Sequence, residues 1–262
     1  MADLFPEVIR IPAGEFTMGA DDGEDDERPA HRVHLDEYFI GAAPVTHDQY
    51  GQFVRDTHHR LPAVRECPQM VTADREAEFR ELATRYVWHT GAAPRDRGNH
   101  PVTLVDYDDA LAYCRWLASR ISMPVRLPSE AEWERAARGG LEGGRYPWGD
   151  AFDPARANFL ARGRDKRHHG TTPVGACGRN GFGLVDTVGN VWQWVDDWYD
   201  PDYYARSPLR NPRGPAVGLL RIVRGGSWVS PDPAMLRCAY RHKVPADSYA
   251  YSIGFRIAYS VL

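Results

Sequence analysis

The stretch Arg224–Arg256, RGGSWVSPDPAMLRCAYRHKVPADSYAYSIGFR, decides the fold of this chain. It opens on a strand signal, passes through an irregular middle and ends on a second strand signal. Gly225 and Gly226 permit a tight turn or a close backbone approach, and Trp228 follows them as a large apolar anchor. We therefore expect the backbone to turn sharply here and to lay Trp228 against the core.

Three more arginines follow Arg224 in this stretch: Arg237, Arg241 and Arg256. The planar guanidinium group suits buried carboxylates and backbone carbonyls because its donors are fixed in one fork. We predict that the role of these arginines is structural.

The composition indicates a loop-rich globular protein. The chain has 262 residues, 43% of them hydrophobic and 26% charged, which is enough to bury a full core. With 24 glycines, 20 prolines, 8 tryptophans and 13 tyrosines, it should have an irregular backbone held by aromatic packing, and few long helices.

The charge and hydropathy of the chain limit the kinds of partner that it can bind. The net charge is −4 and the only lysines are Lys166 and Lys243, so we expect no nucleic-acid and no membrane partner. The chain has neither a signal-peptide pattern at residues 1–6 nor an apolar run of about 18 residues, the length that spans a bilayer. These features predict a soluble, cytoplasmic protein and leave its oligomeric state open.

The four cysteines, Cys67, Cys114, Cys177 and Cys238, lie far apart and form no Cys-x-x-Cys pair. This spacing favours free thiols over a zinc knuckle or a local redox motif.

Local signals place several elements along the chain. Residues 8–19 alternate and turn at Pro12–Gly14, which predicts a short hairpin. Capping signals begin helices at Thr46, at Asp106 and at Ser129, and the last helix should end at Gly139. In the first of these helices, His47 is expected at the surface. Residues 56–99 show a weaker pattern, with one helix over residues 76–86, and are interpreted as an insertion.

Residues 181–198, GFGLVDTVGNVWQWVDDW, bring Asp186, Asn190 and Gln193 close together around Gly189. Side-chain oxygens and turn carbonyls at this spacing can bind calcium, but they are also typical of an Asx-type turn closed by its own side chains. The spacing leaves both interpretations open.

Seven runs together resemble the sulfatase-modifying factor family, to which the formylglycine-generating enzyme belongs. In chain order the runs are residues 11–19 (IPAGEFTMG), 44–46 (PVT), 126–134 (RLPSEAEWE), 146–149 (YPWG), 189–192 (GNVW), 224–228 (RGGSW) and 254–256 (GFR). The runs are distributed in order along nearly the whole chain. The resemblance implies a single domain over residues 1–262 with a C-type-lectin-like α+β fold that is low in regular structure.

The family contains several functions, so the fold alone leaves the function open. It includes sulfoxide synthases, a pyoverdine-tailoring enzyme and hypervariable ligand-binding proteins. In the formylglycine-generating enzyme, two cysteines after Arg-Gly-Gly-Ser bind copper. Here the first position falls on Ser230 and the second on Met235 or Pro233, depending on the register, and no cysteine lies between Ser227 and Arg237. We therefore do not expect formylglycine generation through a copper dithiolate, although Cys238 remains open as an unconventional thiol.

The resemblance also implies metal ligands. The family's calcium loop matches the side chains of Asp186 and Gln193 and the carbonyls of Gly189 and Val191. Gln193 stands where family members often have Glu. A second calcium site would begin at Asn158, but its distal carboxylate position falls on Lys166. We expect structural calcium at the first site.

The expected active cleft follows from the same resemblance. Ser227 and Trp192 match its catalytic positions, and the expected substrate-binding residues are Trp228, Ser230, Arg241, Tyr249 and Tyr251. The histidines His168, His169 and His242 could converge on the cleft from separate loops.

Two functions follow from this pattern. The first is a metal- and oxygen-dependent oxidative tailoring enzyme that uses iron or copper and acts on a small molecule or peptide. The alternative is a non-catalytic ligand-binding module whose binding surface includes Ser230, Asp232, Asp247, Ser248, Tyr249 and Tyr251.

Overall fold

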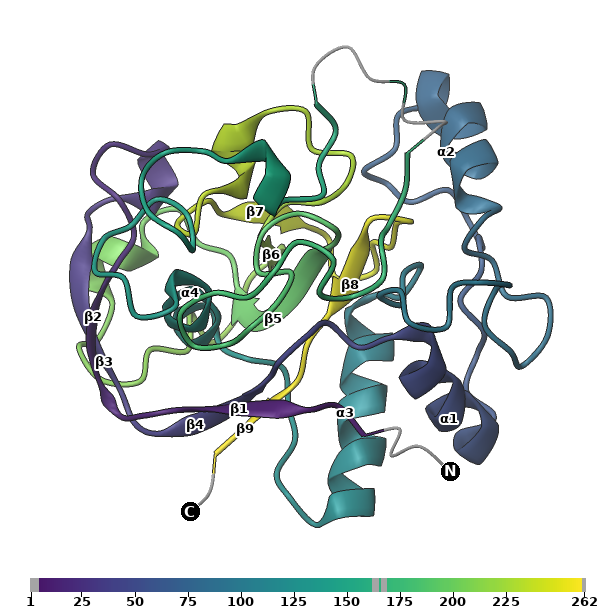
Figure 1. Cartoon of the computed structure of the whole chain (residues 1–262), viewed down its shortest axis with the longest axis horizontal. Helices are drawn as coiled ribbons and strands as arrows, with labels where there is room; N and C mark the ends of the chain where they lie inside the picture. The colour runs from purple at the N-terminus through teal and green to yellow at the C-terminus, as the bar shows by residue number, and fades with distance from the viewer. Residues whose placement is uncertain (1–4, 162–164, 166–168, 261–262) are drawn as a thin grey trace.

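A computed structural model describes residues 5–161, 165 and 169–260 (Figure 1). The helices are α1 (His47–Thr57), α2 (Glu76–Ala83), α3 (Tyr107–Ile121) and α4 (Glu130–Arg138). The strands are β1 (Val8–Ile11), β2 (Gly14–Met18), β3 (His31–Leu35), β4 (Tyr38–Gly41), β5 (Trp192–Trp198), β6 (Arg221–Arg224), β7 (His242–Val244), β8 (Ile253–Phe255) and β9 (Ala258–Tyr259). Most of the remaining chain is loops and single 3₁₀ turns, so the predicted loop-rich α+β architecture is confirmed.

The strands form three small sheets. The largest has the order β7-β6-β5-β8, and its β5–β8 pair is parallel while the others are antiparallel. A second sheet has the order β1-β4-β9, and β2 pairs with β3 alone. The stretch Arg224–Arg256 thus contributes the end of β6 and all of β7 and β8, with a 3₁₀ turn over Pro233–Leu236 between them.

The three capped helices begin where the sequence predicts. The side chains of Thr46, Asp106 and Ser129 each accept a hydrogen bond from the backbone N–H of the third helical residue, whose side chain in turn accepts one from the backbone N–H of the cap residue. These reciprocal bonds satisfy amide groups that the first helical turn leaves unpaired. Gly139 ends α4 with φ of 63°, a conformation that glycine adopts at little cost.

Two local predictions were wrong. The residues on either side of Pro12–Gly14 form β1 and β2, but these strands pair with β4 and β3, not with each other. The turn at Pro12–Gly14 thus separates two strands that belong to different sheets, so tertiary pairing overrode the local hairpin signal. His47 is fully buried, since the segment that contains Trp88 covers the first turn of α1.

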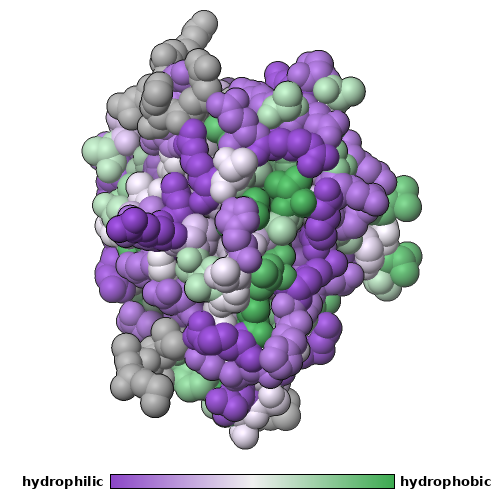
Figure 2. Space-filling view, turned by 90° about the vertical axis from the view of Figure 1, so that its right-hand side faces the viewer, coloured by the Kyte–Doolittle hydropathy of each residue, from purple (hydrophilic) through white to green (hydrophobic). Residues whose placement is uncertain are grey.

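Residues 56–99 are packed onto the core. Phe79 and Leu82 of α2, together with Tyr86 and Trp88 beyond it, are buried in the largest apolar cluster, beside α1 and α3. Figure 1 shows α2 above α1 on one side of the molecule, and Figure 2 shows that this face carries a narrow band of apolar side chains between polar ones.

Helix α4 lies at the centre and is held by buried ion pairs. All nine of its residues are buried, and three of them are glutamates. Glu130 pairs with Arg241, Glu132 with Arg126, and Glu134 with both Arg138 and Arg224. Buried carboxylates require such partners because an unpaired charge in the interior is costly.

The predicted structural role of the three arginines is confirmed. Arg237 binds both carboxylate oxygens of Glu27, at 2.6 and 2.7 Å. Arg241 donates to Glu130, and Arg256 donates mainly to backbone carbonyls. Within the described ranges, no helix is both long and apolar enough to cross a membrane.

Candidate functional site

An apolar cleft of about 200 Å³ lies between the largest sheet and the segment around α2. Trp192 at the start of β5 and Ile253 of β8 are register partners in the sheet and both line the cleft. Opposite them stand Val71 and Phe79 from the segment 56–99. The full lining is Met70, Val71, Arg75, Glu78, Phe79, Trp192, Val229, His242, Ala250, Tyr251, Ser252 and Ile253.

His242 is the titratable imidazole of this cleft. Its ring is packed against that of Trp192, with the centroids 4.9 Å apart and the planes tilted by 30°. Burial lowers the pKa of His242, and the neighbouring Lys243 charge lowers it further. The imidazole is therefore neutral near pH 7, and a neutral imidazole can accept a proton or bind a metal ion.

Tyr251 forms the aromatic side of the cleft. Its ring lies 5.3 Å from Phe79 and 5.5 Å from Trp228, centroid to centroid. Trp228 is fully buried and its indole N–H donates to the carbonyl of Tyr251 at 3.1 Å. Burial raises the pKa of Tyr251 to about 12, so its hydroxyl stays protonated and can serve as a hydrogen-bond donor.

The structure separates the predicted site residues into two groups. Trp192 and Tyr251 line the cleft, whereas Ser227, Trp228, Ser230, Arg241 and Tyr249 do not. Ser227 is fully buried: its backbone N–H donates to the Ser230 hydroxyl at 3.0 Å, and its own hydroxyl accepts from Val229 N–H at 3.4 Å. These two serines close a turn beneath the cleft, and in the described structure neither hydroxyl reaches the cleft.

Tyr249 and Arg241 also have structural contacts. The Tyr249 hydroxyl donates to the carbonyl of Glu66 and accepts from the backbone N–H of Arg65, so it ties the segment 56–99 to the core. The buried Arg241 donates to Glu130 and to the carbonyl of Asp26, and it lines a different, polar hollow beside Lys243.

Several oxygens of the loop expected to bind calcium already accept hydrogen bonds from the protein itself. The Gln193 side-chain N–H₂ donates to the carbonyls of Asp186, at 2.8 Å, and Val191, at 3.4 Å. The Gln193 side-chain oxygen accepts from Trp133 and Arg256. A calcium ion at the expected site would need that side-chain oxygen and the carbonyl of Val191 as ligands. The residues present therefore do not fit the ion.

The other expected metal ligands lie apart. Asn158 is buried and donates to the carbonyl of Gly170 at 2.9 Å, while Lys166 and His168 fall outside the described residues. The ring of His169 lies against Trp228, 6.1 Å between centroids, and is not among the residues that line the cleft. Across the described residues, no three His, Cys, Asp or Glu side chains are grouped as a metal site.

The cysteines do not form a dithiolate. All four are free thiols, and Cys114 and Cys238 are buried. Cys238 is surrounded by the apolar cluster that contains Trp133, Val195 and Ile222. Burial raises its pKa to about 12, so it remains a thiol and not the thiolate that binds copper.

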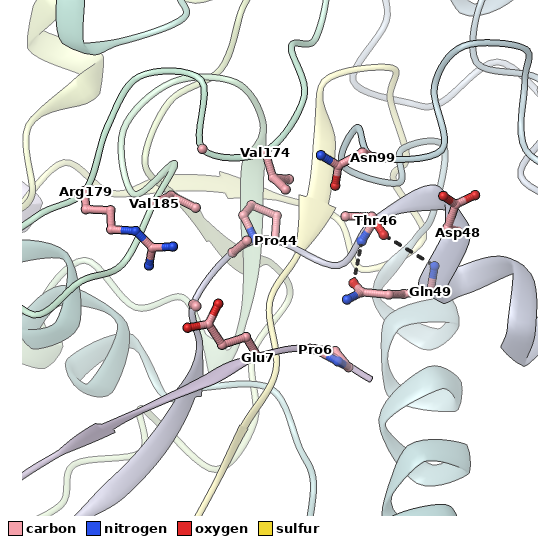
Figure 3. Close-up of a pocket in the computed structure, with 13 residues that line it drawn as sticks. Pro6, Glu7, Pro44, Thr46, Asp48, Gln49, Asn99, Val174, Arg179 and Val185 are labelled. Carbon is pink, nitrogen blue, oxygen red and sulfur yellow. Dashed lines mark hydrogen bonds between the residues drawn. The ribbon is translucent and has the colours of Figure 1, made fainter. Parts of the chain in front are cut away.

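A second, more polar hollow of about 310 Å³ lies where β4 leads into α1 (Figure 3). Its charged side chains, Glu7, Asp48 and Arg179, are exposed. The polar atoms of Thr46 and Gln49 are occupied by the capping box of α1, drawn as dashed lines in Figure 3. The Trp192 cleft is therefore the better candidate site, because it combines aromatic walls with a half-buried titratable group, His242.

Sequence reasoning missed the contribution of residues 56–99. Met70, Val71, Arg75, Glu78 and Phe79 form one side of the cleft, yet no motif marks them. His242 was one of three open histidines, and only the pairing of β7 with β6 brings it next to Trp192. No local sequence signal could have identified the segment 56–99 or His242 as part of the cleft, because each reaches the cleft only when distant segments of the chain pack together.

The sequence and the fold resemble those of known proteins. The family described as "Sulfatase-modifying factor enzyme 1-like domain" matches this chain over residues 2–261. The formylglycine-generating enzyme of Streptomyces coelicolor is 39% identical, over 95% of this chain and 88% of that protein. Serine/threonine-protein kinase Pkn1 of Chlamydia trachomatis is 36% identical over 98% of this chain, but the match spans 39% of that longer protein. Among solved structures, PvdO from Pseudomonas aeruginosa superposes with a TM-score of 0.80 at 28% identity, covering 99% of this chain and 96% of PvdO.

These similarities define the class of the protein: it is a C-type-lectin-like domain of the kind found in formylglycine-generating enzymes. The chain belongs to the sulfatase-modifying factor family.

Proposed function

We propose that this protein is a tailoring enzyme that oxidises a small molecule or a peptide side chain in the Trp192 cleft, with His242 as the proton acceptor. The observation that carries the proposal is the pairing of a neutral, half-buried imidazole with an aromatic, apolar cleft. Such a combination is typical of catalytic sites because a base with a lowered pKa is free to act near neutral pH.

The size of the cleft limits what it can bind. About 200 Å³ accommodates one ring or one side chain but not a whole drug-sized ligand, which usually needs at least about 300 Å³. Trp192, Tyr251 and Phe79 offer faces and edges to a flat group. The substrate would therefore insert one ring or side chain, while Arg75 and Glu78 bind polar parts of the rest.

The proposed reaction removes two electrons and two protons from the inserted group and forms a new double bond there. Dioxygen is the oxidant and becomes hydrogen peroxide, which receives both electrons and both protons. His242 takes the first proton from the substrate and passes it on. Tyr251, whose hydroxyl remains protonated, would donate a hydrogen bond to the inserted group.

Iron or copper could assist electron transfer to dioxygen, but the described residues supply His242 as a single imidazole in the cleft and no grouped set of three ligating side chains. A metal would therefore have to be held in part by the substrate. No step above depends on it, and the experiment includes metal-free, iron and copper conditions.

The test incubates the purified protein with extracts of its own cells, in air and under argon, and follows oxygen uptake and the mass spectrum. We expect a product that has lost two hydrogen atoms and that forms in air but not under argon. His242→Gln should abolish its formation, whereas the exposed control His89→Gln should not. The proposal fails if no product forms under any metal condition, or if His242→Gln is as active as the control.

The receptor-like alternative is not favoured. Its binding surface was expected to include Ser230, Ser248 and Tyr249, and the structure buries all three, with 3%, 1% and 4% of their surfaces exposed. A variable recognition surface must be reachable by its ligand. The Ser230 side chain closes a turn and the Tyr249 side chain anchors the segment 56–99 instead.

A further inference from the structure

We propose that the loop Asp186–Gln193 is closed by the chain itself, with the side-chain amide of Gln193 in the place where relatives are expected to hold calcium. The structural role that the family resemblance assigns to an ion would then be performed by one N–H₂ group and by the guanidinium of Arg256. This inference is independent of the proposed oxidation, because the loop does not line the cleft apart from Trp192.

The orientation of the Gln193 amide is determined by its neighbours. Its oxygen faces two groups that can only donate, the Trp133 indole N–H at 3.0 Å and the Arg256 Nε at 2.5 Å. Its nitrogen faces two groups that can only accept, the carbonyls of Asp186 and Val191. A flipped amide would set donor against donor and acceptor against acceptor, so the orientation is not interchangeable.

The carbonyl oxygens of Asp186 and Val191 are therefore already paired. The resemblance implies the Val191 carbonyl as a calcium ligand, and the Asp186 carbonyl shares the same N–H₂ group with it. A cation entering the loop would have to displace the N–H₂ group from them and would then face a donor nitrogen in place of a carboxylate oxygen. Calcium binds oxygen ligands and gains affinity from their negative charge, which a neutral amide does not supply.

Arg256 adds a positive charge beside the loop. Its guanidinium is fully buried and donates to the carbonyls of Val185, at 2.9 Å, and Asp186, at 3.1 Å. The Asp186 carboxylate is nearby, but it accepts from the backbone of Gly175 at 3.0 Å and from the Asn190 side chain at 3.3 Å. A divalent cation would be repelled by the guanidinium and would find no second carboxylate in the loop to offset it.

The first experiment uses the protein without substitutions. We expect its Tm to be the same in EGTA and in millimolar calcium, and we expect no calcium to remain bound after dialysis. Added terbium, which replaces calcium and emits when a nearby tryptophan is excited, should give no saturable emission. A Tm that rises with calcium concentration, as ligand linkage requires for a bound ion, or a saturable terbium signal would overturn the proposal.

The second experiment exchanges the nitrogen for an oxygen. In Gln193→Glu, one carboxylate oxygen can keep the bonds from Trp133 and Arg256, while the other faces the carbonyls of Asp186 and Val191. We expect this variant to melt at a lower temperature in EGTA and to recover as calcium is added, with Trp133-sensitised terbium emission. Magnesium should not replace calcium, since it requires a tighter octahedral site.

The matched control is Gln49→Glu, in the capping box of α1. Gln49 accepts from the Thr46 N–H through its side-chain oxygen, which glutamate retains. This variant carries the same charge change and should show no calcium response. If Gln193→Glu folds and does not respond to calcium, or does not fold at any calcium concentration, the amide is not standing in for an ion and the proposal is wrong.

Discussion

Acid should destabilise this protein through His47, and the size of the effect can be worked out from the structure. The imidazole is fully buried at the first residue of α1. Its Nδ1 accepts a hydrogen bond from the Trp88 indole N–H at 3.0 Å, so it cannot carry a proton there without opposing two donors. Burial lowers the pKa of His47 to about 3, with smaller contributions from the charges of His100 and Arg97.

The sign follows from comparing the folded and unfolded states. The unfolded chain binds a proton at His47 below about pH 6.5, whereas the folded protein does not until near its lowered pKa. The contribution that neutral His47 makes to the free energy of unfolding is therefore fully present above about pH 6.5 and is lost progressively as the pH falls below that value. At about pH 5 the loss from His47 alone is about 2 kcal/mol, and any folded pKa below about 4 gives nearly the same value.

The assay is urea unfolding of the protein and of His47→Asn between about pH 7 and pH 5. The asparagine side-chain oxygen can still accept from Trp88 but does not titrate, so this variant should lose about 2 kcal/mol less over that interval. His58→Asn, at the exposed end of the same helix in a left-handed conformation that asparagine tolerates, is the control and should keep the full pH dependence. Equal pH dependence in the protein and in His47→Asn would refute the reasoning.

Two further predictions concern buried groups. Glu134→Gln should lower the free energy of unfolding by about 3–5 kcal/mol, because it removes the buried carboxylate that pairs with both Arg138 and Arg224 and leaves Arg224 with Glu130 alone, at 3.4 Å. Glu142→Gln in an exposed pair should cost less than about 1 kcal/mol by the same urea measurement. A similar loss in both variants would contradict this. Cys238, whose burial raises its pKa to about 12, should resist iodoacetamide at about pH 8 in the native protein and react once the protein is unfolded, as peptide mass mapping would show. Rapid native labelling of Cys238 would show that its environment is not the one described.

Much of the scaffold could be predicted from short-range patterns. The capping residues Thr46, Asp106 and Ser129 each define a helix start, because the donor and acceptor involved lie within one turn. The hairpin expected around Pro12 failed for the opposite reason: the partners of β1 and β2 lie further along the chain, and a local turn signal contains no information about them.

The sequence predicted only part of the candidate site. Trp192 and Tyr251 were expected in the cleft and line it, while Ser227 and Ser230 share its neighbourhood but bond to each other. Neighbouring positions in a motif can point to opposite sides of a backbone turn, and only the folded chain decides which side chain reaches the open space.

The sequence by itself determined the family, the capped helices and the absence of a cysteine pair after Arg224–Ser227, since these depend on which residues stand at which positions. Tertiary structure alone decided how the stretch Arg224–Arg256 is used. It brought His242 against Trp192, set α2 across the cleft from them, and placed Arg256 where it orients the amide of Gln193. The physical reason is that burial and hydrogen-bond partnership are properties of segments that meet in space, and the partners here are tens of residues apart in the chain.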